Sequence, residues 1–162
     1  MKTSILVLTA LVLVFTFGLN NTFALEGIKL PSLFNPEESF SLFDLKGKVL
    51  LLNFWTIGCP YCKMVLPILD KIQAIFPNDI RVISILYARG KDIDEAKRWI
   101  HEKGINKILF LLDEKGIAFK EFDIVGIPHT IFFDCDGNKV TELRGAFSEE
   151  FILSVVRKIL GK

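Results

Sequence analysis

Two cysteines that are separated by two residues offer the clearest chemistry in this sequence. Cys59 and Cys62 enclose Pro60 and Tyr61, shortly after an apolar run, residues 49–55, that is typical of a strand buried on both faces. A helix that starts here places Cys59 at its N-terminus, where free N–H groups and the helix dipole favour a thiolate. Pro60 fits the first turn of such a helix because it lacks an N–H group. Since a thiolate is the attacking group in disulfide exchange, the spacing predicts that Cys59 attacks a substrate disulfide and that Cys62 resolves the mixed disulfide.

Three other uses of a Cys-x-x-Cys pair fit the sequence less well. A structural disulfide across so short a loop would constrain the unfolded chain little. A zinc site needs two further ligands, and Cys135 with the two histidines of the sequence is not a convincing set. Haem attachment requires His directly after the second Cys, where this sequence has Lys63. A redox-active dithiol that uses no metal and no cofactor is therefore the favoured interpretation.

The segments around the cysteines alternate between strand and helix patterns. A capping box of Asp92 and Glu95 is expected to start the second helix, and Ser148 is expected to cap the last one. The expected elements are strands 40–42, 49–55, 80–87 and 108–112, helices 59–76, 92–103 and 117–122, a hairpin of 130–133 with 139–143, and a final helix after Ser148. This order predicts an α/β fold with a mostly parallel sheet, helices on both faces and an antiparallel hairpin at one side.

The first 24 residues differ in composition from the rest of the chain. They contain a lysine as their only charged residue, and residues 5–19 are almost wholly apolar. Such a run fits the core of a signal peptide and is short for a bilayer span, which needs about 20 residues. Residues 1–24 are therefore expected to be either a signal peptide cleaved after Ala24 or an N-terminal membrane anchor. Residues 25–39 are expected to form an irregular lead-in, and residues 40–162 to form the folded domain.

The composition of the chain excludes several classes of partner. Of its 162 residues, 51% are apolar, which is ample for a packed core and argues against disorder. The net charge is +1 and no basic run occurs, so no nucleic acid partner is expected. Contact with a membrane is expected only through the N-terminal segment, if that segment is not cleaved.

Two motifs together resemble the thioredoxin superfamily. The stretch from Asn53 to Pro67, NFWTIGCPYCKMVLP, resembles the active-site strand and helix of that family. The stretch from Gly126 to Thr130, GIPHT, is similar to its cis-proline loop. An inserted helix and strand between Asp92 and Leu112, the turn of residues 134–137 (DCDG) and the expected export signal at the N-terminus resemble the TlpA/ResA-type branch of exported thiol–disulfide oxidoreductases. The resemblance implies a thioredoxin fold, a three-layer sandwich with a mixed central sheet and an inserted helix and strand.

The resemblance also implies roles for residues beside the cysteines. It implies that Pro128 has a cis peptide bond and packs against the cysteine pair. The backbone of Ile127 would then be free to pair with an extended substrate peptide, as in strand addition. Trp55 would shield the disulfide, with ordinary core packing as the alternative role. Pro60 and Tyr61 between the cysteines resemble the dipeptide of glutaredoxins.

The sequence departs from the family pattern at four positions. Asn53 stands where thioredoxins have a buried Asp, and Val65 stands where ResA-like proteins often have Glu. Gly58 replaces the usual Trp before the first Cys and is expected to open the rim of the site. His129 follows the expected cis-proline, where Thr is usual. We consider two hypotheses for His129: a titrating group near the thiols, or a rim residue that points to solvent.

These observations predict a thiol–disulfide oxidoreductase that acts outside the cytoplasmic membrane. The expected reaction is the reduction of protein disulfides, with cytochrome c maturation as one pathway. Its partners would be client proteins with disulfides or dithiols and an upstream thiol electron donor. The alternatives are an oxidase or isomerase of disulfides on the same fold, and a copper-handling protein of thioredoxin fold.

Overall fold

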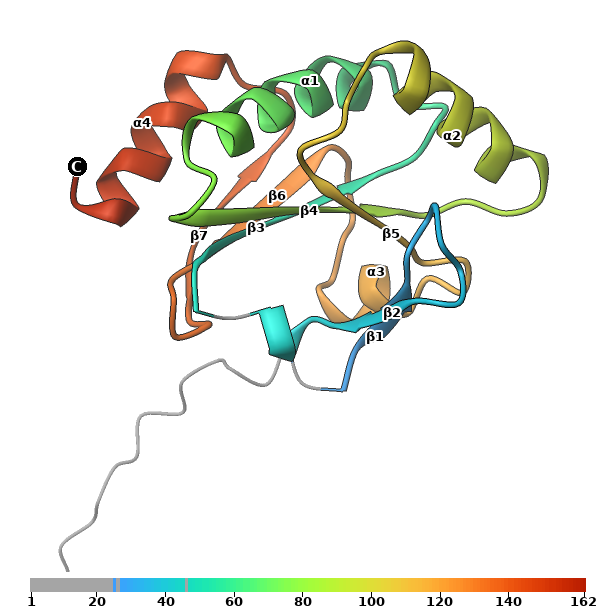
Figure 1. The fold of residues 1–162 in the computed structure, drawn as a ribbon, viewed down its shortest axis with the longest axis horizontal. Helices are drawn as coiled ribbons and strands as arrows, with labels where there is room; N and C mark the ends of the chain where they lie inside the picture. Colours follow the sequence, from blue (N-terminus) through green and yellow to red (C-terminus); the bar gives the residue numbers. More distant parts are fainter. Residues whose placement is uncertain (1–24, 26, 46) are drawn as a thin grey trace, which may run out of the picture.

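A mixed five-stranded sheet forms the centre of the protein (Figure 1). The structure is a computed structural model and describes residues 25, 27–45 and 47–162, so the expected leader 1–24 lies outside the described residues. The sheet has the order β5-β4-β3-β6-β7. Its strands are β3 (Val49–Trp55), β4 (Ile80–Leu86), β5 (Leu109–Leu112), β6 (His129–Phe133) and β7 (Lys139–Arg144). The pairs β3–β4 and β4–β5 are parallel, whereas β3–β6 and β6–β7 are antiparallel.

Helices and a small second sheet cover the two faces of the central sheet (Figure 1). One face is covered by α1 (Pro60–Ile75), α2 (Lys91–Glu102) and α4 (Glu149–Leu160). The other face is covered by α3 (Ile117–Glu121), the short 3₁₀ helix η2 (Phe43–Leu45) and a two-stranded sheet of β1 (Lys29–Pro31) and β2 (Ser39–Ser41). The three-layer thioredoxin fold expected from the sequence is confirmed, with α2 and β5 as the inserted helix and strand.

The central strand β3 explains the apolar run that the sequence shows before the cysteines. All seven of its residues are buried. Because side chains alternate along a strand, Leu51 and Trp55 join the core under the helices, whereas Leu50 and Phe54 join the core on the opposite face. A strand that is buried on both faces has no polar side, and this is why no period-2 pattern is visible there.

Two expectations about local structure are wrong. The segment 25–39 is not irregular throughout, because β1 forms in it and pairs with β2 outside the central sheet. The capping box of Asp92 and Glu95 does not form. Helix α2 begins at Lys91, after Gly90 with φ 53°, and no side chain caps it. Glycine adopts this left-handed conformation easily, so the chain enters the helix before Asp92 can act as a cap.

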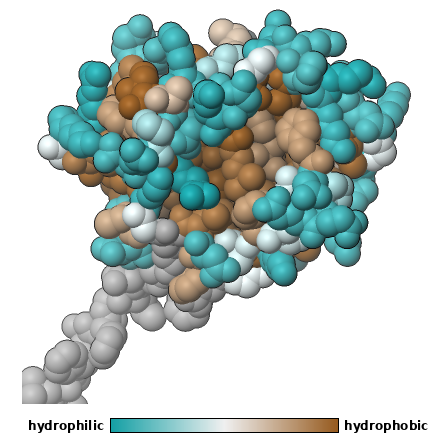
Figure 2. Space-filling model, viewed as in Figure 1, coloured by the Kyte–Doolittle hydropathy of each residue, from teal (hydrophilic) through white to brown (hydrophobic). Residues whose placement is uncertain are grey.

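The surface and the helices add three further observations. In Figure 2, apolar side chains gather in a hollow across the middle of the visible face, and hydrophilic side chains surround them. None of the helices in the described part of the chain combines the length and apolar character that a membrane crossing requires. The expected cap of the last helix is confirmed, since Ser148 Oγ accepts a hydrogen bond of 3.3 Å from the Phe151 N–H group.

Candidate active site

The two cysteines lie at the start of α1, the helix that follows β3 in the chain. Cys59 is the N-cap residue of α1, with extended backbone angles, and Cys62 lies in the first turn of the helix. The two form a disulfide with their Cα atoms 5.3 Å apart. The backbone N–H of Cys62 donates a hydrogen bond of 3.1 Å to the Sγ atom of Cys59. A thiolate at Cys59 would therefore have a free N–H group and the positive end of the helix dipole beside it.

Cys59 is more exposed than Cys62, as disulfide exchange requires of the cysteine that attacks a substrate. Cys59 keeps 9% of its surface exposed, whereas Cys62 is fully buried. Pro60 and Tyr61 are exposed, and 63% of the Tyr61 surface faces solvent. Gly58 is also exposed, and a Cβ atom added there would meet no other atom within 4 Å. The rim beside Cys59 is therefore open to a large partner.

The loop before β6 carries the expected proline. The Ile127–Pro128 peptide bond is cis, and Pro128 is buried. The carbonyl oxygen of Pro128 accepts a hydrogen bond of 2.8 Å from Gly145 N–H. Ile127 is half-buried and packs against the core cluster that contains both cysteines. Its backbone N–H and C=O groups make no hydrogen bond within the described part of the chain.

Trp55 is fully buried in the core cluster that contains Cys59 and Cys62. Its ring centroid lies 6.0 Å from that of Trp99 and 6.1 Å from that of Phe110. The indole Nε1 atom has no hydrogen-bond partner among the described residues. The structure thus gives Trp55 a core-packing role, and it brings Trp55 together with the disulfide in one cluster.

His129 has a different position from either of the two expected from the sequence. It is 1% exposed, so it is not a rim residue that points to solvent. It pairs with Phe54 across β3 and β6, and its ring centroid lies 6.4 Å from that of Phe54. Because directly paired residues point to the same face of a sheet, the His129 side chain lies on the face opposite to the cysteines. The structure does not bring His129 and the disulfide together.

A carboxylate holds the buried His129 ring in place. His129 Nε2 lies 3.1 Å from Glu142 Oε2, and Nδ1 has no partner among the described residues. Burial lowers the pKa of His129 below its ordinary value of 6.5 and outweighs the opposite effect of Glu142. A hydrogen bond from Lys139, with contributions from His129, lowers the pKa of Glu142 to about 2. Glu142 is therefore ionised and accepts a hydrogen bond from a neutral imidazole.

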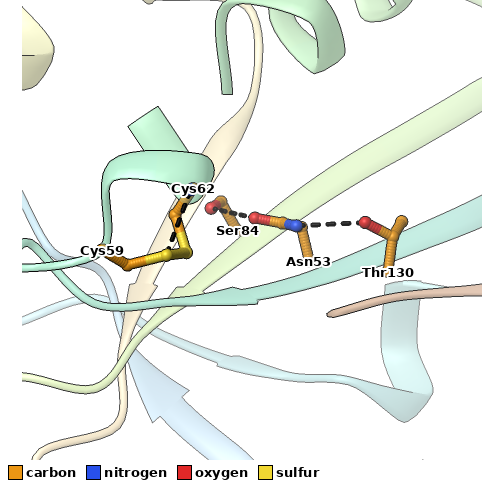
Figure 3. Close-up of a disulfide and its surroundings, with 5 residues drawn as sticks. All are labelled: Asn53, Cys59, Cys62, Ser84 and Thr130. Carbon is orange, nitrogen blue, oxygen red and sulfur yellow. Dashed lines mark hydrogen bonds between the residues drawn. A yellow bond between two sulfur atoms is a disulfide. The ribbon is translucent and has the colours of Figure 1, made fainter. Parts of the chain in front are cut away.

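Two polar residues that the sequence alone does not single out, Ser84 and Thr130, lie in the surroundings of the disulfide (Figure 3). The Ser84 hydroxyl donates a hydrogen bond of 3.3 Å to Asn53 Oδ1. The Asn53 amide Nδ2 donates one of 3.0 Å to Thr130 Oγ1. All three side chains are buried. A serine inside the apolar run of β4 was a signal in the sequence, but only the strand register shows that it lies beside Asn53.

Comparison with known proteins agrees with this geometry. Residues 36–160 match the family model described as a thioredoxin-like domain. The chain is 28% identical to the thioredoxin-like protein YneN of Bacillus subtilis, over 62% of this chain and 58% of that protein. It is 33% identical to the thiol:disulfide interchange protein DsbE of Yersinia pestis, over 67% of this chain and 56% of that protein. It is 25% identical to the thiol-disulfide oxidoreductase ResA of Bacillus thuringiensis, over 75% and 69%.

The fold is also similar to solved structures. A putative thiol:disulfide interchange protein DsbE from Chlorobium tepidum superposes with a TM-score of 0.73 and 20% identity, covering 83% of this chain and 93% of that one. The chain spans less than two thirds of the length of YneN and of DsbE from Yersinia pestis. The match to the family model extends over most of the chain and includes the Cys59–Cys62 pair and the cis-proline loop. This chain belongs to the thioredoxin-like family, and within it the chain is similar to ResA and DsbE.

Proposed function

We propose that this protein is a thiol–disulfide oxidoreductase that reduces disulfides of client proteins through Cys59 and Cys62. The observation that carries the proposal is the asymmetry of the pair. Cys59 is the sulfur that a partner can reach, at a helix N-terminus with an N–H donor, whereas Cys62 is buried behind it. This arrangement suits an attacking thiolate and an internal resolving thiol.

The reaction proceeds by two exchanges in which sulfur atoms and electrons balance. The Cys59 thiolate attacks one sulfur of the client disulfide, and the other client sulfur leaves as a thiolate. Cys62 then loses its proton and attacks Cys59 in the mixed disulfide, which releases the second client thiolate. The client gains two electrons and takes up two protons, and the Cys59–Cys62 disulfide forms. An upstream thiol donor must reduce this disulfide before the next cycle.

The loop of Ile127 and Pro128 is the proposed platform for the client. The unpaired backbone groups of Ile127 can hydrogen-bond to an extended peptide, as in the addition of a strand to a sheet edge. The open rim at Gly58 and the exposed ring of Tyr61 leave room for a folded client beside Cys59. Main-chain pairing does not depend on client side chains, so the platform suits more than one client sequence.

We place this activity outside the cytoplasmic membrane, with cytochrome c maturation as one pathway. The support is the apolar segment 5–19 after a single lysine, and the similarity to DsbE and ResA. The segment 1–24 would act as a cleaved signal peptide or as an N-terminal membrane anchor. The domain division proposed from the sequence, with a lead-in over 25–39 and the catalytic domain over 40–162, is retained in this proposal.

The experiment that tests the function compares three activities of the same preparation. With dithiothreitol as electron donor, the protein should accelerate the reduction of insulin, and the Cys59→Ser variant should not. Faster oxidation of reduced ribonuclease, or faster rearrangement of scrambled ribonuclease, with no effect on insulin would instead indicate an oxidase or an isomerase. Stoichiometric binding of Cu(I) by the reduced protein, with none of these activities, would indicate metal handling.

A further inference from the structure

The resolving step poses an electrostatic problem at Cys62. This residue is fully buried, and burial disfavours a thiolate. Apart from the cysteines, the buried residues that can ionise within the described part of the chain are Asp113 and His129. The Asp113 carboxylate accepts hydrogen bonds from the N–H groups of Ile117 and Phe119 at the start of α3. His129 lies on the opposite face of the sheet, so neither group serves Cys62.

Three neutral polar side chains occupy the sheet face that α1 covers. Asn53, Ser84 and Thr130 come from the neighbouring strands β3, β4 and β6, and direct register pairs join Asn53 to the other two. Directly paired residues share a face, and the neighbours of Asn53 on its face, Leu51 and Trp55, belong to the core cluster that contains Cys62. We call these three residues the Asn53 triad. Figure 3 draws it in the surroundings of the disulfide.

The hydrogen bonds within the Asn53 triad leave part of its capacity unused. The amide of Asn53 uses its oxygen for Ser84 and one of its two N–H groups for Thr130. The Ser84 hydroxyl can rotate, and its bond to Asn53 is long, at 3.3 Å, so it gives up little when it turns to another acceptor. The bond of 3.0 Å to Thr130 keeps the Asn53 amide in place.

We propose that the Asn53 triad stabilises the thiolate of Cys62 during the resolving step, with the Ser84 hydroxyl as the donor to its sulfur. Asn53 and Thr130 are positioning residues that hold Ser84 in place. When the disulfide is closed, Ser84 donates to Asn53. When Cys62 ionises, the Ser84 hydroxyl turns to the sulfur, because a hydrogen bond to a charged acceptor is stronger than one to an amide oxygen. The proton of Cys62 goes to water, and the sulfur then bonds to Cys59 as the client thiolate leaves.

This inference rests on the proposed exchange reaction. Kinetics with two phases test the two proposals separately, because the first phase reports attack by Cys59 and the second reports the resolving step at Cys62. The reduced protein, with Cys135→Ser to remove the exposed free thiol, is mixed with the aromatic disulfide 5,5′-dithiobis(2-nitrobenzoate). Attack by Cys59 releases a first coloured thiolate in a step whose rate depends on reagent concentration. Attack by Cys62 releases the second in a step whose rate does not. A wild-type site without a first phase would overturn the proposed function itself.

The variants Ser84→Ala and Thr130→Val remove one hydroxyl each at little cost in volume. In Ser84→Ala the second phase should slow about tenfold, the factor that corresponds to about 1.4 kcal/mol, while the first phase is unchanged. Thr130→Val should slow the second phase less. Ile83→Val is the matched control, because Ile83 precedes Ser84 in β4 and is buried on the opposite face. A normal second phase in Ser84→Ala, or equal slowing in Ile83→Val, would overturn the inference.

Discussion

The side chains of His129 and Thr130 project from opposite faces of the central sheet, although the two residues are neighbours in β6. Thr130 bonds to Asn53 on the face that carries the cysteines. His129 bonds to Glu142 and packs near Phe54 on the other face. The residue that could titrate is therefore kept away from the thiols, and neutral polar groups lie on their side of the sheet.

The buried position of His129 predicts acid sensitivity of the fold. Because burial lowers the pKa of His129 in the folded state, the unfolded chain binds its proton first as the pH falls below about 6.5. The free energy of unfolding should then fall by at most about 1.4 kcal/mol per pH unit. Glu142, with its pKa lowered to about 2, contributes only at lower pH, as the pH falls from about 4.5 towards 2. Urea unfolding between pH 7.5 and 5 measures the effect of His129.

His129→Gln is the control for this effect, since an amide can still donate to Glu142 and does not titrate in this range. Its free energy of unfolding should change less between pH 7.5 and 5 than that of the wild type. Equal slopes for the two proteins would mean that His129 does not contribute to the pH dependence.

A carboxylate in place of Asn53 should make the stability of the domain depend on pH in the opposite sense. Burial raises the pKa of a carboxyl group, so in Asn53→Asp the stability is retained at low pH and lost as the pH rises through the folded-state pKa. An unpaired buried charge costs about 3 kcal/mol or more. We expect Asn53→Asp to be strongly destabilised at pH 8 and much less so at pH 5. Asn53→Ala, measured alongside, should lose a similar amount at both pH values.

The two expected helix caps give a direct test of local structure. Ser148 caps α4, so Ser148→Ala should lower the free energy of unfolding by about 1 kcal/mol. Asp92 lies in the first turn of α2 without capping it, so Asp92→Ala should cost only a few tenths of a kcal/mol through the helix dipole. Denaturant unfolding of the two variants checks the difference. A loss at Asp92 as large as that at Ser148 would show that Asp92 caps the helix after all.

Much of the fold could be predicted because its signals are local. The apolar run of β3, the N-cap position of Cys59 and the Ser148 cap each depend on a few consecutive residues. The start of α2 could not be predicted in this way. Gly90 and Asp92 both offer a plausible start, and only the path of the chain after β4 decides between them.

The part of the candidate site that depends on the spacing of residues along the chain could be predicted from the sequence. The part that depends on how the strands pair in the sheet could not. Cys59 and Cys62 lie three positions apart at the start of one helix, so the sequence alone predicts that they are close together. The contact of Asn53 with Ser84 and Thr130 joins residues 31 and 77 positions apart. A shift of one residue in the β3–β6 register would exchange the faces of His129 and Thr130, and the sequence alone does not fix that register.

The order of attack can be tested by trapping. The Cys62→Ser variant should accumulate a mixed disulfide between Cys59 and a client peptide, because the resolving thiol is lost. The Cys59→Ser variant should accumulate little, since Cys62 is fully buried and cannot reach a client. Mass spectrometry of peptides, in a background with Cys135→Ser, identifies the linked cysteine. Trapping through Cys62 alone would reverse the assigned roles.

The most direct test of the central claim is a redox titration of the Cys59–Cys62 pair. The protein is equilibrated with glutathione at graded ratios of reduced to oxidised form, quenched with acid, alkylated and weighed by mass spectrometry. A redox-active pair should show a single two-electron transition in which both cysteines change state together, and this transition should be absent in Cys59→Ser. A thiol content that stays the same at every ratio would show a structural disulfide or inert thiols, and would contradict a role of Cys59 and Cys62 in disulfide exchange.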